Sequence, residues 1–119
     1  MPTSVLIVDD HPSFRSTARL LLESEGYLVV GEAQDATSAL QAARQLRPDL
    51  VLLDVNLPDL DGFDVAARLT NGRAPGDPVV VLISSRDSSD YGPLVTRSGA
   101  RGFIAKADLS GAAIAALLP

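Results

Sequence analysis

The sequence has no cysteine, no tryptophan and a single lysine among its 119 residues. The absence of cysteine excludes a disulfide scaffold, thiol chemistry and a cysteine-ligated zinc site. No apolar run approaches the roughly 20 residues that a membrane-spanning helix needs. The N-terminus lacks the basic segment of a secretory signal. We therefore expect a cytoplasmic protein with no membrane partner.

Charge is unbalanced toward acid, with 15 acidic residues, 10 basic residues and a formal net charge of −5. A surface that binds duplex nucleic acid needs clustered lysine and arginine to neutralise phosphates. We therefore expect no nucleic-acid binding by this domain alone. The 46% hydrophobic content excludes intrinsic disorder, and the length predicts one domain over residues 1–119.

Five apolar runs of strand length alternate with helix-like segments. The predicted strands are residues 5–8, 27–30, 50–53, 79–83 and 102–105. The predicted helices lie between residues 12 and 26, and at 36–46, 61–69, 87–98 and 109–118, with the fourth interrupted by Gly92 and Pro93. Continuous apolar runs are typical of strands buried on both faces. The alternation predicts a doubly wound α/β sheet of five parallel strands.

Polar side chains collect where the predicted strands end. Asp9 and Asp10 follow the first strand, Asp54 the third, Ser84 the fourth and Lys106 the fifth. Ligands bind at the carboxyl ends of parallel strands, so we expect these side chains to meet. An all-oxygen cluster without histidine or cysteine suits a hard ion such as Mg²⁺. With the metal on Asp9 and Asp10, Asp54 is free to attack phosphorus. The Lys106 ammonium group and the Ser84 hydroxyl group can then stabilise the phosphoryl group.

With these motifs the sequence resembles the response-regulator receiver domain of bacterial two-component systems, over essentially its whole length. The matching segments are Val8-Asp9-Asp10-His11, Leu53-Asp54-Val55-Asn56-Leu57-Pro58 with Gly62, Ile83-Ser84-Ser85, and Gly99 to Lys106. The resemblance implies a flavodoxin-like sheet with strand order 2-1-3-4-5. It also implies a phosphorelay switch, not an enzyme acting on metabolites, which promotes only its own phosphorylation and dephosphorylation.

The resemblance further implies a role for each site residue. Asp54 would accept a phosphoryl group from a sensor histidine kinase or phosphotransfer protein, forming 4-aspartylphosphate with the help of Lys106. Ser84 and Phe103 would switch the surface of the fourth helix, fifth strand and fifth helix, which controls partner or effector binding. The Mg²⁺ site would consist of Asp9, Asp10, Asp54 and the backbone carbonyl of Asn56.

Other polar residues near the motifs receive plainer interpretations. Asp59, Asp61 and Asp64 are interpreted as loop and helix-start charges, and His11 as a residue that flanks the pocket. Ala107 stands where many receivers have proline, which leaves the isomer of the preceding peptide bond open.

Three alternatives remain at the level of the sequence. One is a Mg²⁺-dependent phosphatase with an aspartate nucleophile, one a flavin-binding module on a similar sheet, and one a receiver-like binding module that is not phosphorylated.

Residues 112–118 carry no charge, which is unusual for a surface helix. This observation leads to the hypothesis of a homodimer formed through the C-terminal helix region.

Overall fold

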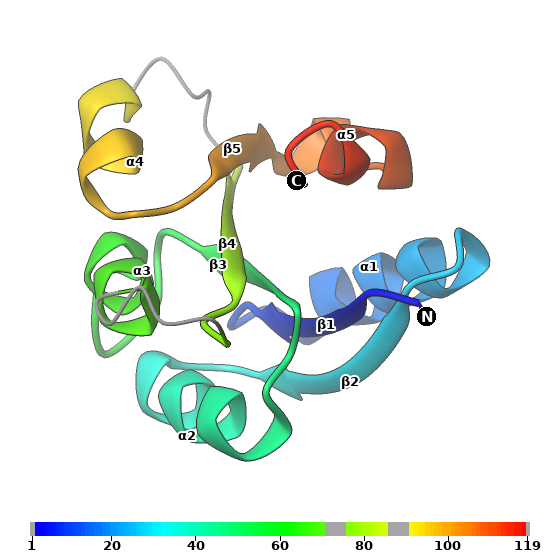
Figure 1. Ribbon diagram of the computed structural model, residues 1–119, viewed down its shortest axis with the longest axis horizontal. Coiled ribbons are helices and arrows are strands. Elements are labelled where there is room, and N and C mark those ends of the chain that lie inside the picture. Colours follow the sequence, from blue (N-terminus) through cyan, green and yellow to red (C-terminus); the bar gives the residue numbers. More distant parts are fainter. Residues whose placement is uncertain (1, 71–75, 86–90, 119) are drawn as a thin grey trace.

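The computed structural model describes residues 2–70, 76–85 and 91–118. Its strands form one sheet of order β2-β1-β3-β4-β5, in which every neighbouring pair is parallel (Figure 1). The strands are β1 (Ser4–Val8), β2 (Leu28–Ala33), β3 (Leu50–Asp54), β4 (Val79–Ser84) and β5 (Gly102–Ala105). This confirms the predicted doubly wound sheet and its strand order 2-1-3-4-5.

Helices cover both faces of the sheet. Helices α1 (Pro12–Ser24) and α5 (Gly111–Ala115) lie on one face, and α2 (Ala36–Leu46), α3 (Gly62–Thr70) and α4 (Gly92–Arg97) on the other (Figure 1). A short 3₁₀ turn, η2 (Lys106–Asp108), joins β5 to α5. Local sequence explains several helix starts: for example, the Asp35 side chain accepts a hydrogen bond from the Ser38 backbone N–H and caps α2.

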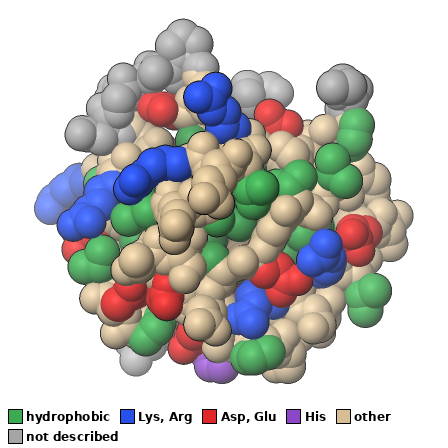
Figure 2. Space-filling model, turned by 90° about the horizontal axis from the view of Figure 1, so that it is seen from below, with side chains coloured by type: hydrophobic (Ala, Val, Ile, Leu, Met, Phe, Trp, Pro, Cys, Tyr) green, Lys and Arg blue, Asp and Glu red, His purple; other side chains and the backbone are tan. Residues whose placement is uncertain are grey.

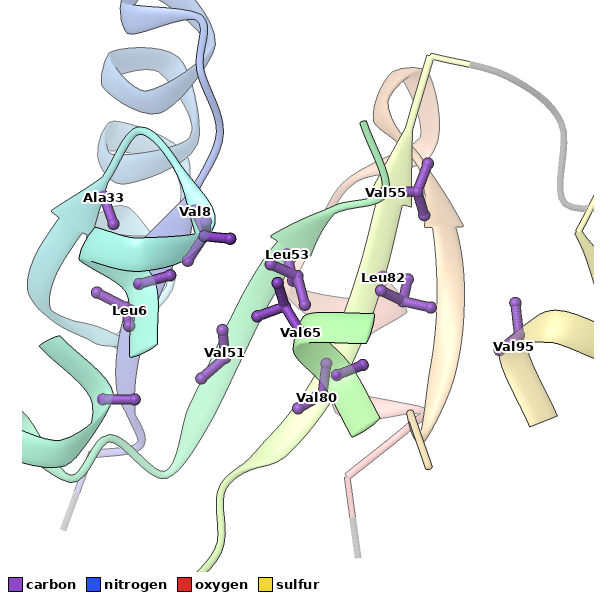
Figure 3. Packing of buried hydrophobic residues seen from close by; sticks show 14 residues of the cluster. Leu6, Val8, Ala33, Val51, Leu53, Val55, Val65, Val80, Leu82 and Val95 are labelled. Carbon is purple, nitrogen blue, oxygen red and sulfur yellow. The ribbon is translucent and has the colours of Figure 1, made fainter. Parts of the chain in front are cut away.

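The sheet separates two hydrophobic clusters. Along β1, Leu6 and Val8 pack toward α2, α3 and α4, whereas Val5 and Ile7 pack toward α1 and α5. All four residues are fully buried, as a strand covered on both faces must be. Figure 3 shows the first cluster, where side chains of β1, β3 and β4 meet Val65 of α3. The core therefore holds the strand ends, and the residues that follow them, in fixed positions.

Two predicted helices differ from the structure. Helix α4 begins at Gly92, so Gly92 and Pro93 start the helix and do not interrupt it, because proline fits the first helical turn. The earlier part of that predicted helix, residues 87–90, lies outside the described residues. The last helix ends at Ala115, because the chain then tightens into turns in which the backbone N–H of Leu117 bonds to the carbonyl of Ile114.

The C-terminal segment buries its large side chains against the sheet. Ile114 is fully buried, and Leu117 and Leu118 pack partly buried against the same cluster. Ala112, Ala115 and Ala116 are the exposed residues of this segment. The homodimer hypothesis stays a prediction. The side chains that this segment exposes to a second copy are those of alanine, which are small.

Two further features concern the backbone and the membrane. No cis peptide bond occurs among the described residues, so the bond between Lys106 and Ala107 is trans. Within the same part of the chain, no helix is both long enough and apolar enough to span a bilayer.

Candidate phosphoacceptor site

The polar residues predicted at the strand ends come together at the carboxyl edge of the sheet. Val8 of β1 pairs with Leu53 of β3, so the residues that follow them, Asp9 and Asp54, lie side by side. Asp9 is fully buried and Asp54 is 3% exposed. Burial of two neighbouring carboxylates is costly unless a cation accompanies them.

Lys106 supplies this cation. Its Nζ atom lies 2.6 Å from Asp9 Oδ2 and 3.2 Å from Asp54 Oδ2, and it donates a hydrogen bond to the latter. The contact with Asp9 is a close ion pair with a fully buried carboxylate. The sole lysine of the chain therefore bridges two buried carboxylates.

The surroundings of the two buried carboxylates shift their pKa values in opposite directions. Burial raises the pKa of Asp54, and the neighbouring charge of Asp9 adds to the increase; the Asn56 backbone N–H and Lys106 offset it only in part. Burial would also raise the pKa of Asp9, but the contact with Lys106 and the hydrogen bond from the His11 backbone N–H outweigh it, so this pKa is lowered. Asp54 is therefore the more basic of the two carboxylates.

Carboxylates and an imidazole cluster closely enough to hold a metal ion. One ligand atom from each of Asp9, Asp10, His11 and Asp54 lies within 4.8 Å of the others. The His11 side chain is 65% exposed, and its Nδ1 lies 3.0 Å from Asp10 Oδ1. A shallow cavity of about 340 Å³ borders Asp10 and residues 55–61.

This cluster fits a hard divalent cation. Its three carboxylates are oxygen donors of the kind that Mg²⁺ prefers. Ligand atoms of all three carboxylates lie within 4.8 Å of one another. Asn56 lines the neighbouring cavity, and the role of its backbone carbonyl stays a prediction.

The loop after β3 closes tightly on Asp54. The Asn56 backbone N–H donates to Asp54 Oδ1 at 2.9 Å, and the Gly62 backbone N–H donates to the carbonyl of Val55 at 2.8 Å. A β-carbon at Gly62 would overlap the backbone carbonyl of Asp54. Gly62 is therefore required by close backbone packing beneath the phosphoacceptor candidate.

Asp59 has a role that the sequence did not reveal. Its carboxylate accepts hydrogen bonds from the backbone N–H groups of Ala36 and Thr37 and from the Thr37 hydroxyl, at 2.8, 3.1 and 2.9 Å. These bonds lower the pKa of Asp59 to about 2. Asp59 therefore ties the loop after β3 to the first turn of α2. Asp61 accepts from the backbone N–H groups at the start of α3, in keeping with its interpretation as a helix-start charge.

Ser84 and Phe103 lie on the neighbouring strands β4 and β5. Ser84 is fully buried at the end of β4 and pairs in register with Ala105. Phe103 is partly buried, and its ring packs on Tyr91 at a centroid distance of 5.7 Å, next to the start of α4. Phe103 therefore links β5 to α4.

Charge is distributed unevenly over the surface. Figure 2 shows basic side chains at the left and top and again at the lower right, with acidic side chains among them and near the histidine at the lower edge. Arg44, Arg47 and Arg68 border a groove between α2 and α3. The face seen in Figure 2 therefore carries charges of both signs.

Comparison with known proteins gives consistent relatives. The family model of the response regulator receiver domain matches residues 5–116. BvgA of Bordetella pertussis is 41% identical over 107 residues, which cover 89% of this chain and 50% of BvgA. The DNA-binding transcriptional activator EvgA of Escherichia coli is 30% identical over 114 residues, 96% of this chain and 55% of EvgA. The chain spans about half the length of the curated relatives it matches.

A solved structure agrees with the sequence relatives. The signal receiver domain of NarL from Mycobacterium tuberculosis superposes with a TM-score of 0.85 at 33% identity, covering 98% of this chain and 96% of that chain. The fold, the carboxylate cluster and these relatives lead to one assignment. The chain belongs to the response regulator receiver domain family of two-component signalling proteins.

Proposed function

We propose that Asp54 is the phosphoacceptor of this domain and receives its phosphoryl group from a phosphohistidine of a sensor histidine kinase or phosphotransfer protein. The observation that carries the proposal is the Lys106 ammonium group, which contacts both Asp9 and Asp54 at the buried edge of the sheet. A phosphoryl group transferred to Asp54 would develop its charge beside this ammonium.

In the proposed reaction a carboxylate oxygen of Asp54 forms an O–P bond as the P–N bond of the phosphohistidine breaks. The bonding electrons stay with the departing imidazole, which takes up a proton. Asp9, Asp10, Asp54 and the Asn56 carbonyl would hold Mg²⁺, which neutralises phosphoryl oxygens when bound. Lys106, whose Nζ contacts Asp54 Oδ2, would neutralise part of the phosphoryl charge, and the Asp54 carboxylate would act as the nucleophile.

Phosphorylation would be read out at the surface of α4, β5 and α5. In the proposal the Ser84 hydroxyl donates to a phosphoryl oxygen, and Phe103 changes position with it. Because the Phe103 ring packs on Tyr91 at the start of α4, its movement would alter that helix. Such switches shift the population between two existing states. EvgA is a DNA-binding transcriptional activator; by analogy, we propose that this surface regulates an effector domain or partner protein.

The experiment is an intact-mass measurement after incubation with Mg²⁺ and a small-molecule phosphodonor. The wild type should gain one phosphoryl group. Asp54→Asn should gain none, whereas Asp64→Asn, which removes an exposed acid at the start of α3, should gain one. An unchanged adduct in Asp54→Asn would refute the assignment. Steady release of phosphate from small phosphoesters would favour the phosphatase alternative.

A further inference from the structure

Phe14 contacts the ammonium group at the centre of the site. Lys106 Nζ lies 4.5 Å from the centroid of the Phe14 ring, above its face. Phe14 comes from the first turns of α1, so it approaches Lys106 from a different element than either Asp9 or Asp54. The ring packs against the cluster formed by α1, α5 and their face of the sheet. A core-anchored aromatic ring therefore forms one side of the lysine's environment.

The contact differs in kind from the two carboxylate contacts. An aromatic face attracts a cation through its quadrupole but carries no net charge, and the attraction is strongest where water is excluded. The Lys106 side chain is only 16% exposed. The ring can therefore hold the ammonium in place without acting as a third anionic partner that would compete with an incoming phosphoryl group.

We propose that Phe14 is a positioning residue for Lys106, and through it for the phosphoryl group on Asp54. This inference rests on the proposed function and deepens it. An aliphatic side chain at position 14 would keep much of the apolar packing but lose the attraction to the ammonium. The Phe14 ring should therefore affect binding of the phosphoryl group only when residue 106 carries a positive charge.

A double-mutant cycle tests this dependence, with beryllofluoride and Mg²⁺ as the probe. Binding is measured for the wild type, Phe14→Leu, Lys106→Met and the double variant. Phe14→Leu should weaken beryllofluoride binding about fivefold in the protein with Lys106. It should change binding by less than about twofold in the Lys106→Met background, because the cation is gone. An equal loss in both backgrounds would show that Phe14 acts through packing alone and would overturn the inference.

A second comparison needs no substitution at Lys106. Phe14→Tyr retains the aromatic face and should bind beryllofluoride within about twofold of the wild type, whereas Phe14→Leu and Phe14→Met should both lose affinity. Thermal unfolding of each variant checks that it folds. If Phe14→Tyr lost as much affinity as Phe14→Leu, or if neither lost any, the inference would be wrong. A wild type that neither bound beryllofluoride nor took up a phosphoryl group would instead refute the proposed function.

Discussion

The ammonium nitrogen of Lys106 lies 2.6 Å from Oδ2 of Asp9, a carboxylate that is fully buried. Removing one partner of a buried ion pair leaves the other charge without compensation, which costs about 3 kcal/mol or more. Lys106→Met should therefore lower the free energy of unfolding by about 3 kcal/mol in a buffer free of divalent ions. Urea denaturation measures this change.

A double variant supplies the control for this prediction. Asp9→Asn combined with Lys106→Met removes both charges of the pair, and it should recover part of the stability lost in Lys106→Met alone. A Lys106→Met protein as stable as the wild type would contradict the bridging role of the ammonium.

Metal binding should stabilise the protein through the carboxylate cluster. At a Mg²⁺ concentration ten times its Kd, the folded state should gain about 1.4 kcal/mol, which appears as a higher Tm. Asp10→Asn removes an exposed member of the cluster and should reduce this gain. Asp64→Asn, at the start of α3, is the matched control and should keep it. Equal Mg²⁺ responses in the two variants would place the metal elsewhere.

Gly62 should tolerate no side chain because its α-carbon packs on the backbone beneath Asp54. A β-carbon there would overlap the Asp54 carbonyl, so Gly62→Ala should lower the free energy of unfolding by about 1–3 kcal/mol. Gly92→Ala is the matched control, since a β-carbon there meets no atom within 4 Å. Its unfolding free energy should change by less than about 0.5 kcal/mol. Equal effects of the two substitutions in urea denaturation would contradict the close approach.

Asp59 should make stability depend on pH in the acid range. Its folded pKa of about 2 lies below the ordinary value of 3.8, because backbone and hydroxyl donors of α2 bind its charged form. The stabilisation is therefore present above about pH 4 and is lost as the pH falls toward 2. The difference in Tm between the wild type and Asp59→Asn should shrink over this interval. A difference that stayed constant from pH 5 to about 2 would argue against the cap.

The sheet and most of the site could be predicted because each depends on local sequence. Continuous apolar runs mark strands buried on both faces, and the residue after each run must lie at the carboxyl edge. Asp9, Asp54 and Lys106 meet for this reason. The start of α1 at Pro12 and the cap of α2 at Asp35 follow from equally local preferences.

Contacts between distant segments could not be predicted in the same way. Asp59 caps a helix that begins 23 residues earlier in the chain, and nothing near Asp59 in the sequence distinguishes it from an ordinary loop acid. The Phe14 ring fits the apolar spacing of α1, so its contact with Lys106 becomes visible only once both elements are placed. After α5 ends at Ala115 the chain continues in turns, and Leu117 and Leu118 pack against the cluster on that face of the sheet.

The most direct test of the central claim is to locate the phosphoryl group on the chain. The protein is phosphorylated with a small-molecule donor and Mg²⁺, reduced with borohydride, which converts an aspartyl phosphate to homoserine, and analysed by peptide mass spectrometry. We predict homoserine at position 54 and at no other aspartate. Homoserine at position 9 or 10, or no conversion in a protein that has gained a phosphoryl mass, would contradict the assignment of Asp54 as the phosphoacceptor.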